Sequence, residues 1–253
     1  MALALSDYAE NKCIDRFLRN QAHTPAPIVY LALFSDATTD AGGGTEAVGG
    51  SYARKAITLS AAAVGVSANT VAISFPNMPA GTWTHAAIID ATTGGNFLFH
   101  GALVTSKTSV AGQTLEVAIG ELDVGLTSGS NATDYLRNNI IDHLLRNQSY
   151  TPPASVYVAL YTTTTTRTGG GIEVTGGSYA RQAMAMVAAS GGVTSNSAVV
   201  DHTMPAATAT HMAILDAVSG GNMLLQSALD TSITTGAGDI VRWAVGDYDL
   251  TVT

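Results

Sequence analysis

Two histidine–aspartate pairs recur along the chain and are the first residues whose chemistry could be catalytic. His85 precedes Asp90 by five positions, and His211 precedes Asp216 by the same spacing. A hydrolase would need each imidazole beside its carboxylate, so that the carboxylate orients a general base. Residues five apart on a straight strand point to opposite faces of the sheet, so these side chains cannot meet. We therefore expect a packed histidine where a strand begins and an aspartate that opens a turn, with no catalytic role.

Other reactive constellations are missing or unpaired in the sequence. Glycosidase chemistry would need two carboxylates across a cleft, and nothing places the recurring Asp123 and Asp249 together. The glycine runs at 42–44 and 169–171 lack the Lys-Ser/Thr of a phosphate-binding loop. Metal-binding and nucleophile motifs are also missing, and the single cysteine, Cys13, is expected to be a small buried hydrophobe. The sequence predicts no catalytic residue, no cofactor, no metal site and no enzyme.

A second recurring motif joins a tyrosine to an arginine. Tyr52-Ala53-Arg54 and Tyr179-Ala180-Arg181 each follow Gly-Gly-Ser and open a predicted strand. We favour a structural ion pair for each arginine, with a contact to another protein as the alternative. The acids proposed as partners are Glu46 and Glu173.

These motifs recur because residues 7–127 occur twice. The offset is 127 at first (134 − 7), as in Leu-Arg-Asn-Gln at 18–21 and 145–148, and becomes 126 after one deletion. A repeat of this length is a whole domain, since solenoid repeats are about 20 to 50 residues long. The sequence predicts two domains, 1–127 and 128–253, joined by a short linker at 125–133.

Composition limits the classes of partner. Charged residues make up 12% of the 253 residues, and the net charge is −8. Globular domains average about 25% charged residues, so this chain suits a surface packed against other chains. The basic residues are scattered, which argues against a nucleic-acid partner. No apolar run is long enough for a membrane span, and the start does not read as a signal peptide, so we expect a cytosol-like environment.

Each copy is predicted to begin with one helix and to continue in strands. Helical spacing of apolar residues covers 7–20, with Ser6 or Asp7 as the cap, Glu10 as a capping-box partner and the prolines after Thr24 as the stop. The pattern predicts a mainly β fold: two tandem antiparallel β-sandwich domains, each preceded by one N-terminal α-helix. The strands expected are 28–34, 52–59, 70–75, 85–90, 97–103 and 115–124, with 156–161 in the second copy.

Glycines mark two further features of this predicted sandwich. Gly94-Gly95 and Gly220-Gly221 fit a two-residue hairpin turn, because both positions can take positive φ. Gly120 and Gly246 each interrupt an alternating apolar pattern that resumes one residue out of phase. Such a slip predicts a β-bulge in the last strand of both copies.

Several short motifs then follow one another in a fixed order. They are Leu-Ser-Asp-Tyr-x-Glu-Asn-Lys at 5–12, Val-Tyr-Leu-Ala-Leu-Phe at 29–34, Gly-Gly-Ser-Tyr-Ala-Arg at 49–54, Thr-His at 84–85 and Gly-Gly-Asn-Phe-Leu-Phe-His-Gly at 94–101. Together they resemble a family of small virion proteins of tailed phages. Its members are often labelled tail fibre proteins, and relatives of this size act as capsid decoration, or cement, proteins. Family members have one domain, whereas this chain has two.

The resemblance implies a non-enzymatic virion structural protein. We expect a cement protein made in the host cytoplasm and bound to the capsid exterior, with the major capsid protein and further copies of itself, as a dimer or trimer, for partners. The N-terminal segment and the glycine-rich loops are the expected contact elements. The residues expected at contacts are Asp7, Tyr8, Arg19, Tyr52, Arg54, Tyr135, Arg146, Tyr179 and Arg181.

The alternative is a tail-fibre or tail-tip protein that binds host-surface glycans. It would need an exposed aromatic platform. Trp83 is a candidate, although Ala209 replaces it in the second copy, and Trp243 is expected to be buried in a core strand. A glycan-cleaving enzyme is a third and weaker reading, because no pair of carboxylates is placed for it.

Overall fold

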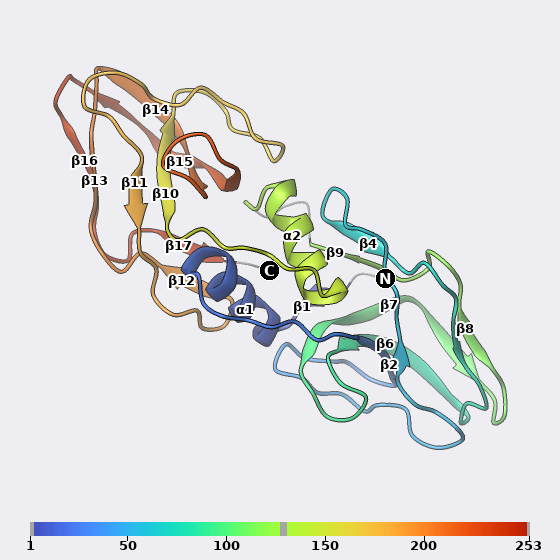
Figure 1. Ribbon diagram of the computed structural model, residues 1–253. Helices are drawn as coiled ribbons and strands as arrows, with labels where there is room; N and C mark the ends of the chain where they lie inside the picture. Colours follow the sequence, from blue (N-terminus) through green and yellow to red (C-terminus); the bar gives the residue numbers. More distant parts are fainter. Residues whose placement is uncertain (1–2, 127–130, 252–253) are drawn as a thin grey trace.

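The computed structural model describes residues 3–126, here called lobe one, and residues 131–251, here called lobe two. The two β-rich lobes lie at opposite ends of the molecule, and the two helices lie between them (Figure 1). One hydrophobic cluster runs through both lobes and both helices, from Leu3 in lobe one to Tyr248 in lobe two. The lobes therefore share a core.

Both helices begin at a capping hydroxyl. Helix α1 spans Asp7–Arg19 and α2 spans Asp134–Arg146. Ser6 and Thr133 are the N-caps, and their side-chain oxygens accept hydrogen bonds from backbone N–H groups one turn on, at 3.2 Å and 3.3 Å respectively. Because the cap is Ser6, Glu10 lies one residue too far along for the predicted capping box.

The helices end earlier than the prolines. Asn20 and Asn147 are the C-caps and adopt the left-handed conformation, with φ of 55° and 52°. Asparagine tolerates this conformation better than most residues and is a common helix stop. The predicted helix at 7–20 is confirmed except for this last residue, and the expectation that the prolines stop it is wrong.

The strands form antiparallel sheets in both lobes. In lobe one the main sheet has the order β1-β7-β6-β2-β3, and two-stranded sheets β4-β9 and β5-β8 accompany it. Lobe two repeats four of these five strands as β11-β10-β14-β15, accompanied by β12-β17 and β13-β16. The strands are β1 Ala4–Leu5, β2 Tyr30–Phe34, β3 Lys55–Ala56, β4 Val66–Ala68, β5 Ile73–Phe75, β6 Gly81–Ile89, β7 Phe97–Ser109, β8 Leu115–Val117, β9 Asp123–Gly125, β10 Val156–Tyr161, β11 Gln182–Met184, β12 Val193–Ser195, β13 Val200–Thr203, β14 Ala207–Leu215, β15 Met223–Thr235, β16 Ile240–Trp243 and β17 Asp249–Thr251.

Alternation along β2 builds two apolar faces. Leu31 and Leu33 point into the large core, whereas Ala32 and Phe34 belong to a smaller cluster on the other face. The glycine-rich loop lies over this second face: a Cβ added at Gly44 would come within 3.2 Å of the Phe34 ring. The mainly β, two-sandwich fold with a helix before each half is confirmed.

Several predicted strands differ in length from those observed: 28–34 begins later, as β2, 70–75 shortens to β5, and 85–90 begins earlier, as β6. The strand predicted at 52–59 is reduced to β3, so Tyr52 and Arg54 lie in the loop before it. The strand predicted at 97–103 continues to Ser109, because β6 pairs with β7 along its whole length. The strand predicted at 156–161 is observed as β10.

The predicted turn and bulge are both corrected. Gly94 and Gly95 do have positive φ, of 60° and 79°, but they lie in a longer loop closed by Asp90 and Asn96. The last strand does not bulge at Gly120; it divides into β8 and β9, which pair with different strands. Register shifts are found instead in the main sheet of lobe one, between β6 and β7.

A buried asparagine explains the division of that last strand. The Asn69 side chain donates to the carbonyls of Val71 and Ala118 and accepts from Leu122 N–H, at 2.8 to 2.9 Å. These bonds hold the intervening turn, in which Gly120 has a φ of 76°. Asn196 does the same in lobe two.

The linker predicted at 125–133 is described only at its ends, because residues 127–130 lie outside the described residues. Its first residue closes β9, and Thr133 caps α2. The domain boundary at 127/128 stays a prediction. No helix among the described residues has the length and apolar character needed to cross a membrane.

Candidate functional site

Helix α1 of lobe one binds the backbone of lobe two. Three polar side chains spaced four residues apart along the helix form one row, so they meet the same neighbouring segment. That segment is the loop that leads into β12. The hydrogen bonds join Gly192 N–H to Asn11 Oδ1 (3.1 Å), Ala189 N–H to Asp15 Oδ1 (3.3 Å) and Arg19 Nε to the Met186 carbonyl (3.2 Å).

Helix α2 returns the same contact to lobe one. Every partner lies 127 residues from its counterpart, so the two contacts are related as in a two-fold dimer. We call the two together the reciprocal helix contact. Its second half joins Gly65 N–H to Asn138 Oδ1 (2.7 Å), Ala62 N–H to Asp142 Oδ1 (2.9 Å) and Arg146 Nε to the Leu59 carbonyl (3.2 Å).

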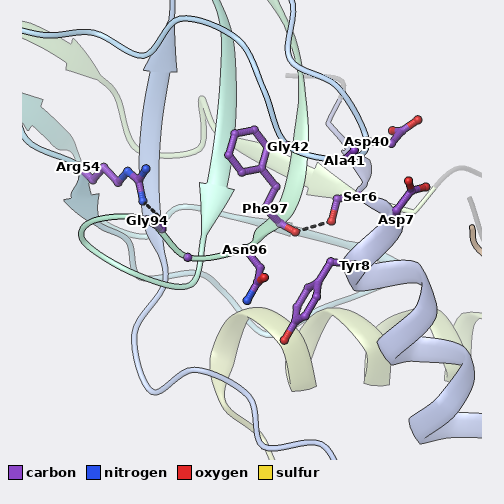
Figure 2. Close-up of a pocket in the computed structure, with 11 residues that line it drawn as sticks. Ser6, Asp7, Tyr8, Asp40, Ala41, Gly42, Arg54, Gly94, Asn96 and Phe97 are labelled. Atoms are coloured by element: carbon purple, nitrogen blue, oxygen red, sulfur yellow. Dashed lines mark hydrogen bonds between the residues drawn. The ribbon is translucent and has the colours of Figure 1, made fainter.

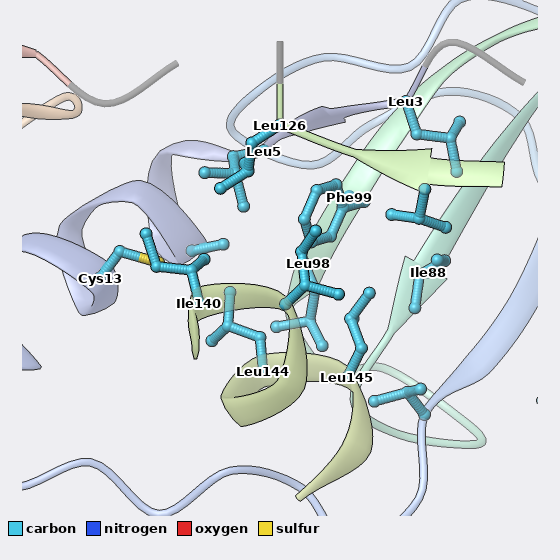
Figure 3. Close-up of a cluster of buried hydrophobic side chains, with 14 of the residues drawn as sticks. Leu3, Leu5, Cys13, Ile88, Leu98, Phe99, Leu126, Ile140, Leu144 and Leu145 are labelled. Atoms are coloured by element: carbon cyan, nitrogen blue, oxygen red, sulfur yellow. The ribbon is translucent and has the colours of Figure 1, made fainter. Parts of the chain in front are cut away.

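Each arginine in this contact is also fixed within its own helix. Arg19 pairs with Asp15 at 2.5 Å, and Arg146 pairs with Asp142 at 2.9 Å. Their apolar neighbours pack between the lobes: Cys13 of α1 and Ile140 of α2 lie in the cluster that includes Phe99 of β7 (Figure 3). Cys13 is 1% exposed, as predicted, and burial raises the pKa of its thiol.

The middle of the contact is where its two halves differ. Arg16 of α1 donates to the Tyr150 carbonyl at 2.5 Å. Its counterpart in α2 is His143, whose Nε2 lies 3.1 Å from Nδ1 of His23. Burial, aided by His143 and nearby cations, lowers the pKa of His23 to about 4. Two neutral imidazoles thus replace an arginine–carbonyl bond.

The recurring arginines form the ion pairs that the sequence favoured. Arg54 binds both carboxylate oxygens of Glu46, at 2.8 and 2.9 Å, and donates to the carbonyls of Ala91 and Gly94. Arg181 does the same with Glu173 and the matching loop of lobe two. Each arginine therefore ties the loop before β3 or β11 to the hairpin loop.

The tyrosines of this motif are structural as well. The Tyr52 hydroxyl accepts from Leu33 N–H and donates to Glu46, both at 3.0 Å, and its ring stacks on Phe75. The Tyr179 hydroxyl accepts from Leu160 N–H at 2.7 Å. Burial raises the pKa of both phenols.

A lobe-one groove of about 510 Å³ brings together Asp7, Tyr8 and Arg54 from the predicted contact residues (Figure 2). Most of its polar groups already have internal partners. Arg54 is bound as above, and Asp40 pairs with His100 at 2.8 Å. Most of the polar groups that line this groove thus serve to hold the surrounding loops together. Its full lining is Ser6, Asp7, Tyr8, Asp40, Ala41, Gly42, Arg54, Gly94, Gly95, Asn96 and Phe97.

The other predicted contact residues lie elsewhere. Arg19 and Arg146 belong to the reciprocal helix contact, so they are engaged inside the chain. Tyr135 is 37% exposed, and partial burial raises the pKa of its phenol. Lys12 lies 5.5 Å from the centre of the Tyr8 ring. The structure does not bring the nine residues into one surface.

A lobe-two groove of about 440 Å³ has a different lining. Trp243 and Tyr248 form its aromatic base, with ring centres 5.2 Å apart. The buried His202 does not line the groove, but its ring centre lies 5.4 Å from that of Trp243. Its rim carries three exposed carboxylates, and none of the described residues that line it is basic. The lining is Asn131, Met212, Ser227, Ala228, Leu229, Asp230, Thr231, Ile233, Trp243, Asp247, Tyr248, Asp249 and Leu250.

Lobe one is filled at the same place. Val117, Leu122 and Val124, the counterparts of Trp243, Tyr248 and Leu250, are each 0% exposed. The two tryptophans also exchange roles. Trp83 is buried at 5% exposed and donates to Ser109, so it is no sugar platform, whereas Trp243, which was expected to be buried, is half-buried and lines the groove.

The duplicated histidine–aspartate pairs do not meet. His85 lies 2.9 Å from the Thr84 hydroxyl, while the Asp90 carboxylate accepts both from Asn96 N–H and from its side-chain amide. Asp216 and Asn222 repeat this in lobe two. The aspartate opens and closes its own hairpin loop, as the sequence predicted. The expectation that the histidine stands where a strand begins is wrong, because His85 and His211 lie in the middle of β6 and β14.

Sequence reasoning missed two sets of residues. Asn11 and Asn138 anchor the reciprocal helix contact, and their repetition at matching positions was the available signal. The lobe-two groove follows from aromatic-for-aliphatic replacements at core positions. A position-by-position comparison of the two copies in the sequence would have revealed these replacements.

Comparison with known proteins agrees with the tandem organisation. The family model described as podophage GP4 fiber I protein gp80 matches residues 4–125 and again 131–251. No curated protein gave a match. Two successive matches account for nearly all of the chain. The protein therefore belongs to the podophage GP4 fiber I protein gp80 family: it is a non-enzymatic structural protein of a phage virion fibre, with the family's region present twice.

Proposed function

We propose that this chain is a fibre subunit that binds host-surface glycans. The observation that carries the proposal is the lobe-two groove, where the aromatic side chains of Trp243 and Tyr248 occupy positions that buried aliphatic residues hold in lobe one. Ligand sites are typically concave, largely apolar and edged by a few polar groups. Because the groove is present in one of two related lobes, the shared fold alone does not account for it.

The reciprocal helix contact supports this role by fixing the two lobes to each other. A fibre protein must transmit force between the virion and the cell surface. Six backbone hydrogen bonds from helix side chains and a continuous core oppose bending between the lobes. The groove is thus presented on a rigid support, which reduces the ordering cost of binding.

The cement role expected from the sequence has weaker support. The family description names a fibre and does not mention a capsid. Low surface charge fits packing against other proteins in a fibre as well as on a shell. We therefore place the chain's partners in the fibre and on the host surface, and leave the major capsid protein as the rival. Self-association as a dimer or trimer stays a prediction.

Two linked experiments test the proposal. Gold-labelled antibody against the chain, viewed on intact virions by electron microscopy, should mark fibres and leave the head surface bare. Purified chain added to host cells should then compete with phage adsorption, and removal of surface polysaccharide should abolish its binding. Labelling of the head in many copies, without competition for adsorption, would overturn the proposal in favour of cement.

A further inference from the structure

From the lobe-two groove we infer a single carbohydrate site per chain, selective for neutral or amino pyranoses over acidic ones. This inference rests on the proposed function and adds its location, its stoichiometry and its ligand class. The argument uses two features of the groove: its aromatic base and its acidic rim.

The aromatic base fits the apolar face of a sugar ring. Pyranoses carry several C–H groups on one face, which pack on the electron-rich face of an indole. Trp243 is half-buried and braced by Tyr248 and His202, with ring-centre distances of 5.2 and 5.4 Å. A braced ring loses little freedom when a ligand packs on it.

The acidic rim sets the class of sugar. Carboxylates are pure acceptors, so they suit the hydroxyl and ammonium donors of neutral and amino sugars. Asp230 and Asp249 are exposed, and Asp247 binds Ala244 N–H through one oxygen. A uronic acid or another anionic sugar would meet three like charges with no basic group among the described lining residues.

Tyr248 supports Trp243 by packing. It lines the groove but is 4% exposed, and its ring centre lies 5.2 Å from that of Trp243. Its hydroxyl is buried, so we assign it no hydrogen bond to the sugar.

The duplication predicts the stoichiometry. In lobe one, the positions of Trp243 and Tyr248 are held by Val117 and Leu122, both fully buried. Position 104, the counterpart of Asp230, is an exposed valine. Lobe one thus lacks the indole ring, the tyrosine packed against it and one of the acids, so one sugar should bind per chain.

The test is a titration of the full-length chain with glucose, galactose and mannose, their 2-amino counterparts, and glucuronic acid. Saturation-transfer NMR detects weak binding, and calorimetry with an oligosaccharide of the best sugar gives the stoichiometry. We expect binding of at least one neutral or amino sugar, one site per chain, and at least tenfold weaker binding of glucuronic acid.

Single substitutions test whether the sugar binds in the lobe-two groove. Trp243→Ala should abolish the saturation-transfer signal, and Asp249→Asn should weaken binding at least fivefold. Asp123→Asn, at the same position of lobe one, is the matched control and should bind as the parent does. Thermal melts confirm that each variant is folded.

Three outcomes would overturn the inference: no neutral or amino sugar binds, glucuronic acid binds as well as they do, or Trp243→Ala and Asp249→Asn both bind like the parent. Binding to host cells separates this failure from failure of the proposed function. Glycan-dependent cell binding by both groove variants would leave the fibre role standing and remove only this site.

Discussion

The two lobes are alike along most of the contact where they meet and unlike at the lobe-two groove. At the reciprocal helix contact, Asn, Asp and Arg recur at matching helix positions and bind matching backbone groups. At the groove, aliphatic residues of lobe one are replaced by Trp243 and Tyr248. Duplication thus retained the assembly contact and left one lobe free to acquire a binding surface.

The contact also suggests how the tandem chain relates to a one-domain protein. A lobe that carries both the helix and the loop it binds is self-complementary, so two separate copies could pair by a two-fold axis. Linking them in one chain raises the local concentration of each partner. In a single chain the two halves of the contact no longer need identical residues at its centre. Arg16 and His143, which occupy matching positions, are an example.

The largest expected difference between the lobes concerns the tryptophans. Trp83→Ala should lower the free energy of unfolding by about 3–5 kcal/mol, because it empties a buried site and removes the bond to Ser109. Trp243→Ala should cost about 1–2 kcal/mol, because its ring is half-buried. Urea denaturation of both variants checks this. Equal losses would mean that Trp243 is a core residue and the groove is closed in solution.

The reciprocal helix contact should respond equally on its two sides. Asp15→Ala and Asp142→Ala each remove an acceptor for a backbone N–H and an arginine partner, so each should cost about 1–2 kcal/mol. Their effects should add in the double variant, since they share no partner. Small-angle scattering of the double variant should show a more extended molecule. An effect confined to one variant would refute the two-fold relation.

The recurring arginines Arg54 and Arg181 test whether this motif stabilises the fold or contacts another protein. Arg54→Ala and Arg181→Ala should each destabilise the chain by about 1–3 kcal/mol, because a glutamate and two carbonyls lose their donor. Differential scanning calorimetry measures both, with Arg242→Ala as an exposed control. Unchanged stability together with lost binding to virions would assign these arginines to an interface instead.

The smallest expected effect is a pH dependence confined to the half of the contact that contains the histidines. The folded-state pKa of His23 is about 4, below its unfolded value of about 6.5. The contribution of neutral His23 to the free energy of unfolding is therefore fully present above pH 6.5. It is lost as the pH falls toward 4, and the loss is about 1 kcal/mol after allowance for solvent screening. His23→Gln should reduce this slope in melts at pH 4 to 7.

Other histidines must be separated from this effect. The pKa of the buried His202 is also lowered to about 4, so it contributes loss of stability in the same pH range. The comparison is therefore between parent and variant slopes, with His85→Gln as a control outside the contact. A slope unchanged by His23→Gln would show that protonation does not act at the inter-lobe contact.

Much of the fold follows from local pattern. The spacing of Ile14, Phe17 and Leu18 predicts α1, and all three are buried. Pattern does not predict what covers the polar side of a helix. Asn11 and Asp15 read as solvent-facing, yet they bind the other lobe, because a polar contact between segments far apart leaves no hydrophobic periodicity.

The candidate site was less predictable for a related reason. Trp243 alternates along its strand as Val117 does, which indicates burial. Its real exposure depends on residues from other strands, including Ala209 in place of Trp83. A replacement on one strand that changes the exposure of a residue on another strand can be recognised only from the three-dimensional structure. The division of the last strand was missed similarly, since Asn69 acts from a distant segment.

The central claim is that binding to the host lies in lobe two, and a comparison of matched variants tests it most directly. Fluorescently labelled full-length chain, Asp249→Asn and Asp123→Asn would be titrated onto host cells under identical conditions. The account predicts that Asp249→Asn loses at least fivefold in cell affinity while Asp123→Asn binds as the parent does. Equal affinity of all three, or equal loss in both variants, would contradict it.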